Sequence, residues 1–411
     1  MEKLLNWLVR PRESARAFGH HAAMHAPREV KSGQGSLLAL HGPVEASWIS
    51  EQPESLVVEG YMRNPVVHRC VRLISEAAAS MPWLLYEGRE DVESHPLLDL
   101  LRNPVPGRTA SQMLETLFGY LLLYGNAYMN VVTLDGLPRE LHVLRPDRVR
   151  LVTDREGWPL HWELDGPAHG RIVSAEQPGS EILHLQQFNP LDDWNGLSPL
   201  KAARMALDTH NAASRWNKAL LDNSARPSGA LVYSASDGSN LTPDQFDRLK
   251  EELETGYTGS ARAGRPLLLE GGLDWKAMGY SPKDMDFMEA RNGAARDIAL
   301  AFGVPPMLLG IPGDNTYSNY QEANRALWRH TILPLAAKTA SAIGAWLGAW
   351  YDEAIRLEFD FDQVDALSAD RDAAWSRLNG ATFLTLNEKR AAAGYAPLQD
   401  GGEQLSDDPH E

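Results

Sequence analysis

Residues 196–223 read GLSPLKAARMALDTHNAASRWNKALLDN, and this stretch decides the layout of the second half of the chain. Ser198 belongs to the residue types that cap helices, and Pro199 suits the first helical position. Apolar residues then recur every three or four positions as far as Leu220. The pattern predicts one long helix from Ser198 to about Asn223.

A second long helix is predicted from Ser281, where Ser281-x-x-Asp284 forms a capping box, to Gly303, which ends it. Between the two helices lies a compact αβ insert, residues 225–280. Two long helices around such an insert exclude a doubly wound sheet and a TIM barrel, because both need regular alternation of strands and helices. The insert is expected to hold a strand at Gly229–Tyr233, a helix opened by Thr242-x-x-Gln245 and closed by Gly256, and a strand at Pro266–Leu269.

The first half of the chain predicts an antiparallel α+β block. One helix is expected after the cap Asn64 and ends at Pro82, and a second runs from Thr109 to Tyr124. After Gly125 the apolar period shifts to two, which is typical of strands. The strands are expected at Ala127–Leu134, Leu141–Leu144, Val149–Thr153, Trp158–Leu164 and Ile182–Leu185.

The C-terminal third begins with a loop, Gly310–Tyr320, that is rich in Gly, Pro and Asn. Ser318-x-x-Gln321 is expected to cap a last long helix, which should kink near Pro334 because proline removes a backbone donor. An amphipathic strand is expected around Leu357–Phe361.

Composition limits the function classes. The 411 residues suffice for two or three domains, and the net charge of −16 argues against a protein that holds DNA tightly by its phosphates. A channel through which DNA slides remains compatible with that charge. We expect no membrane span, since no sufficiently long apolar run stands out. Cys70 is the single cysteine and is expected in the core, which excludes an intramolecular disulfide.

Catalytic motifs are mostly absent from the sequence. No lysine follows a glycine, so a P-loop is excluded, and the zinc-protease, nucleophile-elbow and dinucleotide-binding motifs are missing. Asp360 and Asp362 flank Phe361, so on a strand both carboxylates would share one face as paired metal ligands do. Together with His184 they leave a metal-dependent hydrolase as an alternative, whereas a solvated acidic strand face is the simpler explanation.

Seven short pieces, in order over about residues 60–402, resemble the HK97-type portal proteins, and the compact form also resembles the portals of bacterial gene transfer agents. The pieces are Tyr124-Gly125-Asn126-Ala127-Tyr128, Leu144-Arg145-Pro146-Asp147-Arg148-Val149, Gly196-Leu197-Ser198-Pro199-Leu200, Pro227-Ser228-Gly229-Ala230-Leu231, Val304-Pro305-Pro306 with Leu309-Gly310, Thr316-Tyr317-Ser318-Asn319, and Leu386-Asn387-Glu388-Lys389-Arg390 with Gly394.

The resemblance implies that the chain is divided into the parts of a portal protein. Only the flexible N-terminal arm is predicted from composition alone. The expected parts are the arm (1–45), an α+β wing (46–197), a first stem helix (198–224), a clip (225–280), a second stem helix (281–303), a tunnel loop with a kinked wing helix (304–350), and a final wing strand with a short crown and C-terminal tail (351–411).

The resemblance further implies a structural function in a phage or phage-like particle, with no catalysis, no cofactor and no metal. Twelve copies would form a ring at one capsid vertex, where twelve upright helices about 10 Å apart leave a lumen of roughly 28 Å. Expected partners are double-stranded DNA, passing non-specifically, the major capsid protein, the head-tail connector and the terminase large subunit. A non-portal structural ring protein is the remaining alternative.

Two groups of residues are candidates for the channel. The tunnel loop would present uncharged polar side chains that touch phosphates weakly, namely Asn315, Thr316, Tyr317, Ser318 and Asn319. The stem would place five cations either in the channel or in ion pairs between subunits, namely Arg204, Arg215, Lys218, Arg291 and Arg296.

Overall fold

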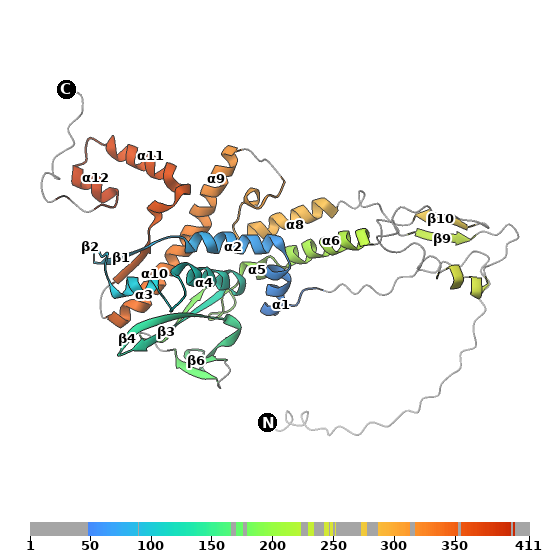
Figure 1. Ribbon diagram of the computed structural model, residues 1–411, viewed down its shortest axis with the longest axis horizontal. Coiled ribbons are helices and arrows are strands. Elements are labelled where there is room, and N and C mark those ends of the chain that lie inside the picture. The colour runs from blue at the N-terminus through green and yellow to red at the C-terminus, as the bar shows by residue number, and fades with distance from the viewer. Residues whose placement is uncertain are drawn as a thin grey trace, which may run out of the picture.

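The computed structural model describes residues 48–88, 90–165, 170–175, 179–222, 229–233, 242–245, 247–249, 251, 273–277, 287–312, 317–351, 355–395 and 398. A body of helices and small sheets extends through two adjacent helices toward a two-stranded ribbon, and two further helices lie at the opposite end of the molecule (Figure 1). The α+β class is therefore as predicted. The expected N-terminal arm lies outside the described residues.

Local capping explains the helices of the first half. Pro53–Val57 (α1) leads into a π-helical turn, Val58–Met62 (η1), and Pro96–Arg102 (α3) is a short helix. Pro65–Ala79 (α2) starts where the Asn64 side chain accepts hydrogen bonds from two backbone N–H groups, and Ala110–Tyr124 (α4) starts at the predicted capping box. Gly125 ends α4 at φ 78°, a conformation that favours glycine.

The sheets of the body are small and antiparallel, as predicted. Asn126–Leu134 (β3) lies between Leu137–Leu144 (β4) and Ile182–Gln186 (β8). Beyond a 3-10 turn, Pro146–Arg148 (η2), a second sheet holds Val149–Thr153 (β5), Pro159–Leu164 (β6) and Arg171–Ser174 (β7). The start of β4 lies four residues before the predicted Leu141, and β7 was not predicted, because neither segment alternates cleanly.

A third sheet joins the two halves of the chain. Trp83–Glu87 (β1) pairs with Glu90–Asp91 (β2) and with Ile355–Phe359 (β11), and the Trp83 and Phe359 rings stack with centroids 4.0 Å apart. The strand predicted at Leu357–Phe361 exists, but it lies two residues earlier, because Asp360 turns the chain into a 3-10 helix, Phe361–Gln363 (η6).

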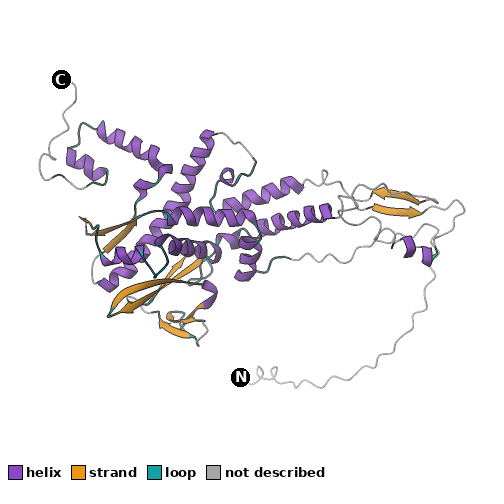
Figure 2. Ribbon diagram, viewed as in Figure 1, coloured by secondary structure: helices purple, strands orange, loops and turns teal. Residues whose placement is uncertain are grey.

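Arg204–Asp222 (α6) and Phe287–Ala301 (α8) are two adjacent helices that project from the body, and this pair is called the stem below (Figure 2). The single helix predicted from Ser198 is wrong in one detail: Pro199–Ala202 (α5) is a separate turn, because the backbone leaves the helical region at Ala203. Ser198 caps α5 as predicted, by accepting a hydrogen bond from Lys201 N at 3.0 Å. The expected start of the second helix, residues 281–286, lies outside the described residues.

The insert contains a two-stranded antiparallel ribbon, Gly229–Tyr233 (β9) and Leu273–Ala277 (β10). The β9 strand was predicted, but β10 was not, and the strand expected at 266–269 lies outside the described residues. Thr242 and Gln245 make both hydrogen bonds of the predicted capping box, at 3.0 and 3.4 Å.

The last long helix is interrupted close to the predicted kink. Tyr317–Leu327 (α9) and Leu333–Tyr351 (α10) are joined by a π-helical turn, Trp328–Ile332 (η5), directly before Pro334. By length and composition alone, Asn319–Tyr351 could cross a membrane, although the sequence predicted no such run. The α10 part instead packs against β4, β8 and β11 in the main core, which explains its apolar character.

Candidate functional site at the base of the stem

A buried polar network lies where the stem meets the body. The Asn64 amide, besides capping α2, donates to His210 Nδ1 at 2.9 Å and to Asn211 Oδ1 at 2.8 Å. Asp208, one turn before, accepts from Ile49 N at 3.1 Å. Burial, aided by the charge of Arg291, lowers the pKa of His210, so its imidazole is neutral and Nδ1 accepts the hydrogen bond from Asn64. The network fixes the direction in which the stem leaves the body.

Candidate stem cations contact partners within their own chain. Arg204 donates to Ile49 O at 3.0 Å and pairs with Glu51, and Arg215 lies 3.9 Å from Glu59. The Arg296 guanidinium donates to the carbonyl of Pro312.

The other two candidates, Lys218 and Arg291, occupy different settings on the two stem helices. Lys218 is exposed on α6, whereas Arg291 is half-buried on α8 near His210. Placement in a channel, or pairing between subunits, stays a prediction for all five cations.

The tunnel-loop candidates lie where α9 begins. A 3-10 turn, Pro306–Leu309 (η4), ends at Gly310, and the chain is then held against α8 by the Arg296 contact to Pro312. The predicted cap at Ser318 is wrong by position, because α9 starts at Tyr317, so Tyr317, Ser318 and Asn319 form its first turn. Asn315 and Thr316 lie outside the described residues.

A contact that sequence reasoning missed ties the stem to the interrupted helix. Gly303, at φ 68°, ends α8 as predicted, and its carbonyl accepts a hydrogen bond from Thr331 Oγ1 at 2.7 Å. A Cβ on Gly303 would lie 2.6 Å from that oxygen. The glycine was visible in the sequence, but nothing there pointed to a partner 28 residues later.

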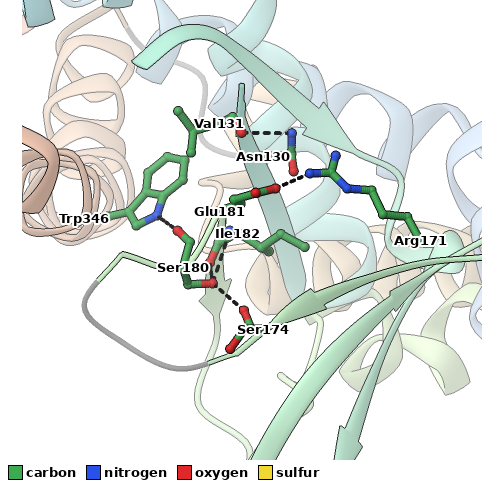
Figure 3. A network of polar contacts seen from close by, with 8 residues as sticks. All are labelled: Asn130, Val131, Arg171, Ser174, Ser180, Glu181, Ile182 and Trp346. Carbon is green, nitrogen blue, oxygen red and sulfur yellow. Dashed lines mark hydrogen bonds and ion pairs between the residues drawn. The ribbon is translucent and has the colours of Figure 1, made fainter. Parts of the chain in front are cut away.

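Figure 3 shows how α10 is fixed to the sheets that contain β7 and β8. Trp346 Nε1 donates to Ser180 O at 2.8 Å, and Ser180 Oγ donates to Ser174 O at 3.0 Å. Trp346 is buried, and its hydrogen bond anchors the C-terminal part of α10 to the body.

The residues proposed for a hydrolase do not form a catalytic group. Asp360 caps η6 by accepting from Asp362 N at 3.0 Å, and it also accepts from Gln363 at 2.8 Å, so the two carboxylates do not share a strand face. His184 stacks on Tyr128 at 4.6 Å, and burial lowers its pKa to about 4. Within the described parts of the chain, no cluster of three His, Cys, Asp or Glu side chains could hold a metal ion.

An α+β body, a two-helix stem with a β-ribbon at its end, and an interrupted helix anchored in the body define a portal-type protein. The family model described as phage portal protein matches residues 65–394. The chain belongs to the phage portal protein family.

Individual relatives agree with that membership. The portal protein of Enterobacteria phage HK97 is 27% identical over 91% of this chain and 88% of its own length, and a Rickettsia bellii protein is 42% identical over 84% and 90%. Among solved structures, a chain from the neck of an empty gene transfer agent particle is 48% identical, with a TM-score of 0.69 over 86% of this chain and 96% of its own.

Proposed function

We propose that copies of this chain form a ring at one vertex of a phage-like particle, and that the ring is the conduit for DNA during packaging and ejection. The observation that carries the proposal is the match, at 48% identity and over nearly its full length, to a chain in the neck of a gene transfer agent particle. The neck of a native gene transfer agent particle, which also matches this chain, was computed with twelvefold symmetry, and this supports the expected ring of twelve.

The particle is proposed to be a gene transfer agent rather than a tailed phage. Identity to the gene transfer agent neck chain is 48%, whereas identity to the HK97 phage portal is 27%. The chain would therefore be a component of the particle and would be assembled in the bacterial cytoplasm.

The parts of the chain are assigned by proposal. Residues 46–197 form the wing, 198–224 and 281–303 the stem, and 225–280 the clip, which would meet the connector and, during packaging, the terminase. The β9–β10 ribbon at the far end of α6 and α8 supports the clip assignment, since a clip must project from the stem. The capsid protein would surround the ring.

The mode of action proposed is passage rather than binding or catalysis. The net charge of −16, repeated around a ring, repels phosphates, so affinity for DNA should be weak and strongly dependent on salt. The commitment of Asp360 to a cap and of His184 to an aromatic stack supports a structural protein over a hydrolase.

Electron microscopy of the purified full-length chain tests the proposal. We expect rings with a central channel wide enough for duplex DNA. A compact monomer that binds a divalent metal ion stoichiometrically would establish the hydrolase alternative, and a ring without a channel would establish the non-portal structural protein.

The tunnel-loop proposal has its own test. Deleting residues 313–316, between the Pro312 contact and the start of α9, should leave rings intact, because both flanks remain anchored. Particles carrying the deletion should package less DNA or lose it. Intact rings whose particles retain DNA normally would exclude a role for the loop in the channel.

A further inference from the structure

The C-terminal hairpin, which we define as residues 365–398, has almost no core of its own. It comprises Asp365–Leu367 (η7), Ser368–Asn379 (α11) and Leu386–Ala392 (α12). Among its described residues, only Lys389 is buried. Five of its large apolar side chains are exposed, namely Phe383 at 78%, Trp375, Leu386, Tyr395 and Leu398, whereas Leu367, Leu378 and Leu384 are partly buried.

Polar contacts hold the hairpin together internally. Thr385 and Glu388 form a capping box, Lys389 Nζ donates to Asn379 O at 3.2 Å, and Leu398 N donates to Asn387 Oδ1 at 2.8 Å. Each such contact at the surface stabilises a fold by about 1 kcal/mol or less. These polar contacts define the conformation of the hairpin, but they do not substitute for the stability that buried apolar surface would give.

Charged contacts, together with the apolar packing of Ala366 and Leu367 against the main core, attach the hairpin to the body. Asp370 lies 2.7 Å from Arg329 and 3.8 Å from Arg325, and Arg371 donates to the carbonyl of Asp362. Figure 1 shows α11 and α12 at the edge of the molecule, with α11 between α9 and α12. Helices of 12 and 7 residues are too short to be stable in water without apolar packing. The hairpin therefore needs a surface that covers it.

The chemistry of the hairpin favours protein over DNA as the covering surface. Its described acidic residues, Asp365, Asp370, Asp372 and Glu388, are matched in number by its basic ones, Arg371, Arg377, Lys389 and Arg390. A surface without excess positive charge gains little from releasing phosphate counterions. Exposed aromatic and aliphatic side chains, in contrast, are characteristic of the centre of a protein interface.

We propose that the hairpin is completed by the adjacent copy of this chain in the ring, which covers Phe383 and Trp375. The proposal rests on the ring of the proposed function, and rotational symmetry explains why the covering partner is another copy. Every hairpin in a closed ring faces the same neighbouring surface, so each is covered equally. The hairpin is then ordered by assembly, whereas the body folds within a single chain.

Thiol labelling can measure whether the neighbouring copy covers the hairpin, because the native chain itself should not react with the label. Cys70 is buried, and burial raises its pKa to about 12, so it carries almost no reactive thiolate. A cysteine introduced by Phe383→Cys would be the reactive thiol, with Trp375→Cys as a second variant should the first not assemble. Leu134→Cys, at an exposed turn of the wing, is the control.

Labelling rates are compared between rings and dissociated monomers, with the ring verified first by light scattering. We expect Phe383→Cys to label at least tenfold more slowly in rings and Leu134→Cys to label equally in both. Equal rates for Phe383→Cys would refute the proposal while the ring stands. Protection already present in monomers, or present only in DNA-filled particles, would also overturn it, because the cover would then be the chain itself or DNA. If the native chain formed no rings, both the proposed function and this inference would be refuted.

Discussion

The body and the C-terminal hairpin each contain a phenylalanine, but the two side chains lie in opposite surroundings. Phe118, in α4, is 0% exposed in the main core, whereas Phe383, between α11 and α12, is 78% exposed. The body buries its apolar residues within one chain, and the hairpin leaves them for a partner. The difference separates what folds in a monomer from what is completed by assembly.

The same contrast appears in the polar contacts. At the stem base, Asn64, His210 and Asn211 form hydrogen bonds away from water. There, loss of one partner leaves a buried group unsatisfied, at about 1–3 kcal/mol. The hairpin depends on ion pairs such as Asp370–Arg329, which are partly exposed and contribute about 0–1 kcal/mol. Four changes test the comparison, from the largest expected effect to the smallest.

The largest effect is expected from a matched pair of substitutions. Phe118→Ala should lower the free energy of unfolding of the monomer by about 3–5 kcal/mol, because it leaves a cavity in a closed core. Phe383→Ala should change it by less than about 0.5 kcal/mol, because the side chain is in water. Urea unfolding of dissociated monomers gives both values.

The effect on ring assembly should be larger for Phe383→Ala than for Phe118→Ala, the reverse of their effects on monomer stability. Phe383→Ala should shift ring dissociation to higher protein concentration, which light scattering can follow. If Phe383→Ala destabilised the monomer as much as Phe118→Ala, the hairpin would be part of the monomer core, and the comparison would fail.

A second effect concerns pH and belongs to the body alone. Burial lowers the pKa of His184 from 6.5 to about 4, so the unfolded chain binds a proton that the folded chain does not over this range. Stability is therefore complete above pH 6.5 and is lost as the pH falls toward 4, by about 3 kcal/mol at the lower limit. Urea unfolding between pH 7 and 4 should show this slope.

The variant His184→Gln should make that slope shallower, since glutamine does not titrate and can still hydrogen-bond to Asn126, and the part of the slope that belongs to His210 should remain. His161, which is only partly buried on β6, provides the matched control through His161→Gln. An unchanged pH slope in His184→Gln would mean that another group titrates.

The third effect probes the link between the stem and the interrupted helix. Gly303→Ala should destabilise the monomer by about 2 kcal/mol, because φ 68° disfavours a side chain and the new Cβ meets Thr331 Oγ1. Gly293→Ala is the control: it lies inside α8 with open space around its Cβ, so alanine should be neutral or stabilising by up to about 1 kcal/mol. Equal effects of both substitutions in thermal unfolding would show that the Thr331 contact does not restrain the stem.

Much of the fold could be predicted from the sequence because local signals agree with the tertiary structure. Asn64, Thr109 and Gly125 each cap or end a helix where expected, and the strand period after Gly125 predicted the antiparallel sheets. The break at Ala203 and the strand β10 escaped prediction, because the first has no local breaker and the second depends on pairing with β9.

The site was predicted less well, because its contacts join distant residues. The spacing of Asp360 and Asp362 suggested paired carboxylates on one strand face. Because β11 ends at Phe359, neither residue lies on the strand, and Asp360 caps the following turn instead. The His210 network and the Thr331–Gly303 bond join segments far apart in the chain, and no period or spacing encodes such pairs. The exposure of Phe383 and Trp375 could not be predicted either, since large aromatic side chains in a sequence look like core residues.

The smallest effect expected, and the closest test of how the hairpin is attached, is Asp370→Asn. The substitution keeps the shape of the side chain and removes the charge that pairs with Arg325 and Arg329. Partly exposed pairs of this kind contribute about 0.5–1 kcal/mol, so hydrogen exchange of α11 amides in the monomer should rise about two- to fivefold. Asp372→Asn, two residues later and exposed, is the control and should leave exchange unchanged.

Salt and assembly should each modify this result in a defined direction. Raising ionic strength should bring the native chain toward the Asp370→Asn exchange rate, because salt screens the pair. In rings the difference between the two proteins should shrink, since the neighbouring copy would then hold α11 by apolar contact. A difference that persisted undiminished in rings would mean that the ion pairs, rather than a neighbour, order the hairpin.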